Sequence, residues 1–212
     1  MNLEPFIKEF FKTPEAQDSC RILREYGSQC DSFIEFGTRG GITAIALLQA
    51  LIDSKKRDFS PRYVGVDIIQ DASIAKITEI SEKIGVSFQF WKGDTKDFPL
   101  FETDGFLWDT FHCAGNLLND LIRVSPHTHK YIIIVGTKVD GTQSEAIRRK
   151  LDIEMVAKEL RISPIDAEKG LLSAISKFLE LNSDWSEACK TGDITILKRV
   201  RNSPNWLFKN SS

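Results

Sequence analysis

Short apolar runs alternate with longer amphipathic stretches through the middle of this chain. The runs are too short for helices and predict strands, whereas the stretches between them repeat apolar residues at helical spacing. We predict strands at 32–36, 63–66, 86–91, 106–109 and 131–135, and helices at 42–52, 73–84 and 117–124. This alternation predicts an α/β fold, Rossmann-like, with a mostly parallel open sheet and helices on both faces.

The two ends of the chain follow other patterns. An apolar face at helical spacing begins with Phe6, Ile7, Phe10 and Phe11 and predicts two short helices before the sheet. Beyond residue 135 we predict helices at 145–160 and 170–181, a turn, and a last strand at 193–197 that runs antiparallel. The predicted divisions are an N-terminal helical segment (1–31), one α/β domain (32–200) and a tail (201–212) containing Trp206.

Composition narrows the possible partners. The 212 residues carry a formal net charge of -2, so no excess of Lys and Arg is present to neutralise a phosphate backbone, and nucleic acid is not favoured as a partner. No uncharged apolar run approaches the roughly 18 residues of a bilayer span, so we expect a soluble, cytoplasmic protein without a membrane partner. The four cysteines lack a C-x-x-C pair, which favours reduced thiols over disulfides or zinc.

A glycine-rich turn follows the first predicted strand. Gly37, Gly40 and Gly41 let the backbone approach a ligand, and the helix that follows points its N–H groups toward it. The spacing is G-x-x-G-G, with Arg39 where a dinucleotide fingerprint needs its second glycine, which disfavours nicotinamide and flavin cofactors. An ordinary strand-to-helix turn would also explain a lone glycine cluster.

Two further carboxylates end neighbouring strands. Asp67 closes the second strand, where an acid can accept hydrogen bonds from a ribose diol, and Asp94 and Thr95 follow the third strand. Carboxyl ends of parallel strands meet at one edge of a sheet. The sequence therefore predicts a nucleoside-binding crevice at that edge.

These motifs resemble class I S-adenosylmethionine-dependent methyltransferases. The first is E-x-G-x-x-G-G after strand one, followed by an acid ending strand two and G-D after strand three. Later matches, among them the stretches 109–112, 117–121, 130–134, 170–175, 182–185 and 193–199, resemble a bacterial subgroup of small-molecule and sugar methyltransferases often labelled cephalosporin-hydroxylase-like. The resemblance implies S-adenosylmethionine as cofactor. The expected cofactor-binding residues are Glu35, Gly37, Thr38, Arg39, Gly40, Gly41, Asp67, Asp94 and Thr95.

One position departs from that subgroup. After the fifth strand the subgroup usually carries His-Asp-Thr, whereas this chain reads Val135-Gly136-Thr137. We therefore expect no bound metal, and the loss of these groups also leaves a catalytically inactive protein as an alternative. His112, with Asp109 three residues earlier, remains as a candidate general base; a structural histidine at a strand end is the alternative. His127 and His129 precede the fifth strand and are expected in a solvated loop at the opposite edge.

The resemblance implies an enzyme that transfers a methyl group to an oxygen, or as second choice a nitrogen, of a small polar acceptor such as a sugar or nucleotide-sugar. The alternative is a catalytically degenerate relative that binds S-adenosylmethionine or S-adenosylhomocysteine, or acts as a partner subunit. An oxidoreductase or hydroxylase would need a nicotinamide fingerprint or a two-His-one-carboxylate site, and neither is visible. The sequence leaves open the identity of the acceptor and whether the chain forms a homo-oligomer.

Overall fold

A computed structural model describes residues 3–53 and 60–200. These residues form a seven-stranded sheet in the order β3-β2-β1-β4-β5-β7-β6, with β1 to β5 parallel and β7 antiparallel to both of its neighbours. The strands are β1 (Ser32–Phe36), β2 (Arg62–Asp67), β3 (Ser87–Lys92), β4 (Thr103–Trp108), β5 (Thr128–Val135), β6 (Trp185–Thr191) and β7 (Ile194–Arg199). The predicted fold class, including the antiparallel strand near the C-terminus, is confirmed.

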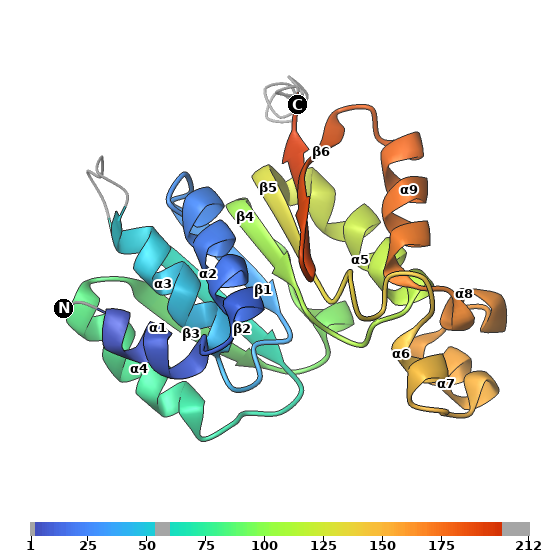
Figure 1. The fold of residues 1–212 in the computed structure, drawn as a ribbon, viewed down its shortest axis with the longest axis horizontal. Helices are drawn as coiled ribbons and strands as arrows, with labels where there is room; N and C mark the ends of the chain where they lie inside the picture. Colours follow the sequence, from blue (N-terminus) through green and yellow to red (C-terminus); the bar gives the residue numbers. More distant parts are fainter. Residues whose placement is uncertain (1–2, 54–59, 201–212) are drawn as a thin grey trace, which may run out of the picture.

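Helices cover both faces of the sheet (Figure 1). One face carries α1 (Glu4–Phe10), α2 (Pro14–Gly27), α3 (Ile42–Asp53) and α4 (Ser73–Ile84). The other carries α5 (Ala114–Val124) and α9 (Leu171–Leu181), and beside them lie α6 (Glu145–Arg148), α7 (Ile153–Leu160) and α8 (Pro164–Glu168). Two short 3₁₀ turns are η1 (Thr95–Asp97) and η2 (Ser125–His127). None of the helices in the described ranges combines the length and apolar character that a bilayer span requires.

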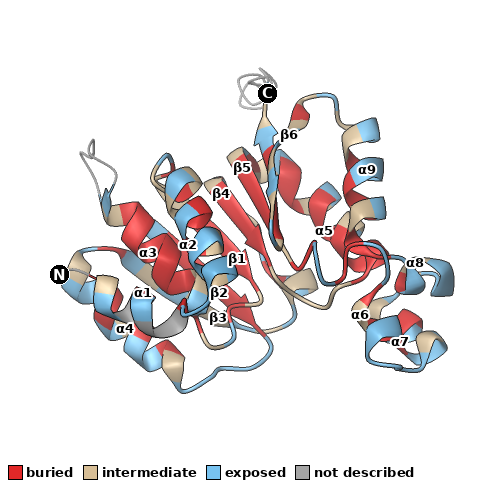
Figure 2. Ribbon diagram, in the orientation of Figure 1, coloured by how far each residue is buried: buried red, intermediate tan, exposed pale blue. Residues whose placement is uncertain are grey.

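Side-chain alternation along the strands divides the core into two layers. In β1, Phe33 belongs to the cluster beneath α1 to α4, whereas Ile34 and Phe36 belong to the cluster beneath α5 and α9, because successive residues of a strand point to opposite faces. Strands β1, β2, β4, β5 and β7 are buried along most of their length (Figure 2), as strands between two helical layers must be, whereas the edge strands β3 and β6 are mainly half-buried or exposed.

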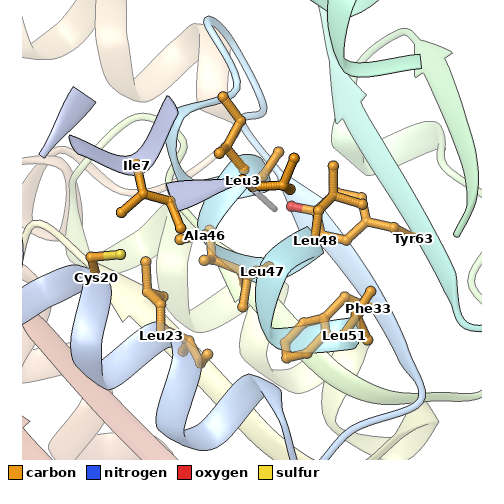
Figure 3. Close-up of a cluster of buried hydrophobic side chains, with 14 of the residues drawn as sticks. Leu3, Ile7, Cys20, Leu23, Phe33, Ala46, Leu47, Leu48, Leu51 and Tyr63 are labelled. Carbon is orange, nitrogen blue, oxygen red and sulfur yellow. The ribbon is translucent and has the colours of Figure 1, made fainter. Parts of the chain in front are cut away.

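Helix α3 is apolar around nearly its whole circumference because it lies between the sheet and other helices. Leu47, Leu48 and Leu51 are fully buried against Phe33 and Tyr63 of the sheet and against side chains of α1 and α2 (Figure 3). The predicted N-terminal helices are both present, with Ile7 and Phe11 buried; the side chains of Phe6 and Phe10 lie outside the described residues, as does the predicted tail with Trp206.

The predicted helix at 145–160 is wrong in extent. It divides into α6 and α7, with Lys150 at a φ of 55° between them and the Asp152 side chain accepting the Met155 N–H as a new N-cap. The short helix α8 follows, with Ser163 as its N-cap, and the sequence pattern did not indicate it. Helices α7 and α8 are largely exposed (Figure 2), so their apolar periodicity was weak.

The edge strand β6 was also missed. Its residues are mainly half-buried or exposed, and only Trp185 is buried, so the segment shows no apolar run. Strands β4 and β5 begin three residues earlier than predicted, and α5 begins at Ala114 instead of Leu117. His127 and His129 lie before and at the start of β5, at the amino edge as expected, where both pair with Glu102.

Candidate functional site

The turns that carry the candidate residues meet at the carboxyl edge of the sheet. Strand β1 lies between β2 and β4; the chain leaves β1 toward α3 on one face and leaves β4 toward α5 on the other. Divergence of this kind opens a crevice between the two strand ends, which is where open α/β sheets bind ligands. The site therefore centres on the turns after β1 and β4.

The glycine turn after β1 packs tightly against the turn after β4. A side chain on Gly37, whose φ is 89°, would lie 1.9 Å from the backbone oxygen of Asp109. The Asp109 N–H donates to the Phe36 carbonyl at 2.9 Å, which joins the two strand ends. A side chain at Gly40, in contrast, would meet nothing within 4 Å, so the outer surface of this turn is open to a ligand.

Asp67 holds two turns together. Its carboxylate accepts the N–H groups of Arg39 and Ile69, both at 2.9 Å, and its backbone oxygen accepts the N–H of Gly93 at 2.9 Å. The residue is 7% exposed, so part of it still faces the edge. Arg39 is exposed with a φ of 37°, and the contact to Asp67 involves its backbone.

Asp67 is followed by two isoleucines that no sequence motif marked. Ile68 is 65% exposed and Ile69 is 62% exposed, directly beside the buried carboxylate. Adjacent exposed apolar residues next to an acid that is predicted to bind a ribose diol offer a surface for a nucleobase. The signal was present in the sequence as two isoleucines continuing an apolar strand past its acid.

Asp94 and Thr95 lie at the same edge beyond β3. The Asp94 side chain accepts the Lys96 N–H at 3.0 Å and caps η1, and the residue is exposed. The Thr95 carbonyl accepts a hydrogen bond from Arg123 of α5. The Gly93 N–H donates to the Asp67 carbonyl, so the turn after β3 contacts the end of β2, which in turn contacts the glycine turn after β1.

Glu35 differs from its expected role. Its side chain is fully buried beneath α3, where it accepts hydrogen bonds from Tyr63 at 2.6 Å and from Thr43. Burial raises the pKa of Glu35 from 4.5 to about 7, although the hydrogen bonds from Thr43 and Tyr63 lower it. Glu35 therefore supports the glycine turn from below instead of contacting a ligand. Thr38, 2% exposed, also packs inward against Gly65.

The buried Glu35 should make stability depend on pH. With a pKa near 4.5 in the unfolded chain and about 7 in the folded one, the folded state binds the extra proton. The free energy of unfolding should therefore fall as pH rises from 4.5 to 7 and stay level above. We expect Glu35→Gln to remove this fall and to be more stable than wild type at pH 8 by up to about 3 kcal/mol.

Denaturant titrations at several pH values measure this difference. Glu82→Gln, which changes an exposed glutamate of α4, is the matched control and should keep the wild-type slope. An unchanged slope in Glu35→Gln would show that Glu35 does not take up a proton on folding.

His112 lies between two carboxylates. Its Nε2 is 3.0 Å from Oδ1 of Asp109, its Nδ1 is 2.8 Å from Oδ2 of Asp140, and its ring stacks on Trp108 with centroids 5.6 Å apart. The side chain is 14% exposed. Asp140, 1% exposed at its side chain, also receives two hydrogen bonds from Arg148 at 2.6 and 3.0 Å.

This geometry favours a protonated His112 over the general base that the sequence suggests. Burial lowers the pKa of His112, but hydrogen bonds to Asp109 and Asp140 and their charges outweigh it, and the pKa is raised. A ring with carboxylates at both nitrogens donates from both and is therefore an imidazolium. Among the three hydrogen-bonded residues Asp109, His112 and Asp140, Asp109 is the one that reaches the surface, with its side chain 34% exposed.

Gly136 explains how this arrangement fits after β5. A side chain there would lie 2.2 Å from Cε1 of His112, so the glycine makes room for the ring. Asp140, four residues later, supplies the acid that the Val135-Gly136-Thr137 sequence lacks. No spacing rule predicts this contact from the sequence, because Asp140 lies 28 residues from His112.

Solved structures with the same architecture are known, although no protein-family model and no curated protein matches the sequence. An O-methyltransferase from Bacillus cereus in complex with SAH matches at 16% identity over 89% of this chain and 82% of that one, with a TM-score of 0.55. An SAH-bound methyltransferase from Podospora anserina matches at 14% over 91% and 87%, also with 0.55. TomG, an O-methyltransferase from Streptomyces achromogenes solved with SAM, matches at 14% over 87% and 80%, with 0.53. The chain has the methyltransferase fold.

The edge of this methyltransferase fold suits S-adenosylmethionine in its chemistry. Asp67 can accept the ribose hydroxyls, the exposed Ile68 and Ile69 can face the adenine, and the open side of Gly40 leads to the first N–H groups of α3. The same edge is less suited to binding a metal ion. Within 3–53 and 60–200, no group of three or more His, Cys, Asp or Glu side chains is arranged to hold an ion.

Proposed function

We propose that this protein is an S-adenosylmethionine-dependent methyltransferase that methylates a hydroxyl oxygen of a small polar acceptor, a sugar or nucleotide-sugar. The observation that carries the proposal is the continuous series of contacts that joins Asp67, the glycine turn and Asp109 at one edge of the sheet. Two of the similar structures are named O-methyltransferases, which supports oxygen as the target. The sugar rests on the resemblance to the sugar-methylating subgroup.

The cofactor would supply an electrophilic methyl group, and the chain's own residues would align it and remove the acceptor's proton. Asp67, Asp94 and the backbone around Gly40 hold the nucleoside side of the crevice. Asp109 is half-buried, and its Oδ2 has no partner among the described residues, so it can accept the hydroxyl proton as the oxygen attacks. His112 acts as a positioning residue: it fixes Asp109 and is itself fixed by Asp140.

The proposal is tested by calorimetry with S-adenosylmethionine and S-adenosylhomocysteine, followed by turnover assays on a panel of sugars and nucleotide-sugars. Binding without turnover on any acceptor would favour the second candidate, a degenerate relative that binds the cofactor or serves as a partner subunit. The observation favouring that candidate is that both nitrogens of His112 are engaged with carboxylates. We place the protein in the cytoplasm, because the spacing of its four cysteines shows no C-x-x-C pair and no dense disulfide framework.

Chelation is expected to leave methyl transfer intact. Displacement at a sulfonium needs no Lewis acid, and Gly136 offers no side chain at a position where the subgroup that the sequence resembles carries a group that could bind metal. Initial rates with and without EDTA measure the effect, with added magnesium as the control. A rate abolished by EDTA and restored by magnesium or manganese would contradict this expectation and point to Asp109 as a ligand.

A further inference from the structure

A cleft of about 220 Å³ lies between η1, α5 and the C-terminal end of α7. Residues of both charge signs and two amides line it: Lys96, Asn116, Asn119, Asp120, Arg123 and Arg161. The volume is far larger than the roughly 10–15 Å³ that one water requires, so the cleft has room for a polyatomic group. None of these six residues is among the predicted cofactor-binding residues, and none takes part in the hydrogen bonds that join Asp109, His112 and Asp140.

Two of the charged residues, Asp120 and Arg123, form hydrogen bonds within the protein. Asp120 accepts the indole N–H of Trp108 at 2.9 Å and lies 3.4 Å from Arg123. Arg123 donates to the carbonyls of three residues around η1, namely Thr95, Lys96 and Phe98. Their charges largely compensate each other, and together they form a fixed wall of the cleft.

Lys96 and Arg161 form no ion pair within the described part of the chain, although the charge of Lys96 opposes the rise that burial causes in the pKa of Asp120. Neither side chain has an ion pair or hydrogen bond to the described part of the chain, and both line the same cleft. Arg161 has a φ of 57° at the C-cap of α7, a left-handed conformation that favours glycine. The cations Lys96, Arg123 and Arg161 outnumber the single acid Asp120, so the lining of the cleft carries a net positive charge that attracts an anion.

The cleft adjoins the proposed active site on two sides. Lys96 is two residues beyond Asp94. Asn116 donates to Oγ1 of Thr110 at 3.0 Å and to the Phe111 carbonyl at 3.1 Å, in the loop that follows Asp109. These contacts place the cleft beside the loops that carry Asp94 and Asp109.

We propose that this cleft binds a phosphate group of the acceptor, with Lys96 and Arg161 as its cationic ligands. The exposed amide of Asn119 is a further donor at its rim. Phosphate suits the pair because its oxygens can accept from both cations, whereas a neutral sugar brings no negative charge to the cleft. The inference rests on the proposed methyl transfer and favours a phosphorylated acceptor, such as a nucleotide-sugar, over a free sugar.

The test is calorimetric titration of the full chain with inorganic pyrophosphate and with UDP-glucose. Wild type should bind both ligands, and Lys96→Ala/Arg161→Gly should bind each at least about tenfold more weakly. Glycine is chosen at position 161 because it relaxes the left-handed backbone, so a loss of binding does not reflect loss of folding. The control, Lys92→Ala/Lys158→Ala, removes two exposed lysines outside the cleft and should bind as wild type does.

S-adenosylmethionine is titrated into the same three proteins to separate this inference from the cofactor assignment. We expect equal cofactor affinity in all three, with and without saturating pyrophosphate. Three results would overturn the cleft assignment: no binding of pyrophosphate to wild type, equal weakening in the control variant, or displacement of S-adenosylmethionine by pyrophosphate. Absent cofactor binding in wild type, with pyrophosphate binding intact, would instead overturn the proposed methyl transfer.

Discussion

Asp67→Ala is expected to weaken S-adenosylmethionine binding at least tenfold and up to about 10⁴-fold, because a carboxylate that accepts two ribose hydroxyls makes two charge-assisted bonds of roughly 1.5–3 kcal/mol each. The structure adds a second cause. The same carboxylate holds the N–H groups of Arg39 and Ile69, so its loss also loosens the glycine turn.

Calorimetry on the wild type and the variant measures the change in affinity, and melting temperatures show whether the fold is kept. Asp71→Ala is the matched control: Asp71 is an exposed acid in the same loop whose carboxylate caps the Ser73 N–H. Its replacement should leave cofactor affinity unchanged. If a folded Asp67→Ala protein bound S-adenosylmethionine with unaltered affinity, the assignment of Asp67 to the ribose site would be wrong.

The second large effect is expected at Asp109. Asp109→Asn should lower turnover by about 10²–10⁴-fold, the usual contribution of a positioned base, while cofactor affinity changes little. Asparagine keeps the shape and can still face His112, but it cannot take up the acceptor's proton. Single-turnover rates on cofactor-saturated protein measure the loss, and a normal rate in the folded variant would exclude Asp109 as the base.

His112→Ala should lower turnover through Asp109, so its effect should depend on pH. The raised pKa of His112 means that the imidazolium, and the order it gives to Asp109, is present below that pKa and lost as pH rises through it. The wild-type rate should therefore show a pH dependence that His112→Ala lacks. His127→Ala and His129→Ala are the controls, because both residues lie with Glu102 at the opposite edge.

Local pattern was enough to predict the sheet and the positions of its loops. The buried strands are apolar runs because both of their faces are covered, and β1 and α4 were predicted to the residue. Since the carboxyl ends of parallel strands meet at one edge, the order of elements alone placed Gly37, Asp67 and Asp94 near one another. Segments with weak burial, such as β6 and the break between α6 and α7, gave no such signal.

Tertiary structure decided which of those residues can reach a ligand and what charge they carry. Glu35 lies one residue before the end of β1, close to the edge that Asp67 also occupies, yet packing beneath α3 buries it and raises its pKa to about 7. His112 acquires its second carboxylate from Asp140, far along the chain, in the space that Gly136 leaves. Spacing rules capture contacts within a helix or strand, whereas burial and long-range ion pairs depend on how distant elements pack, and these set protonation at this site.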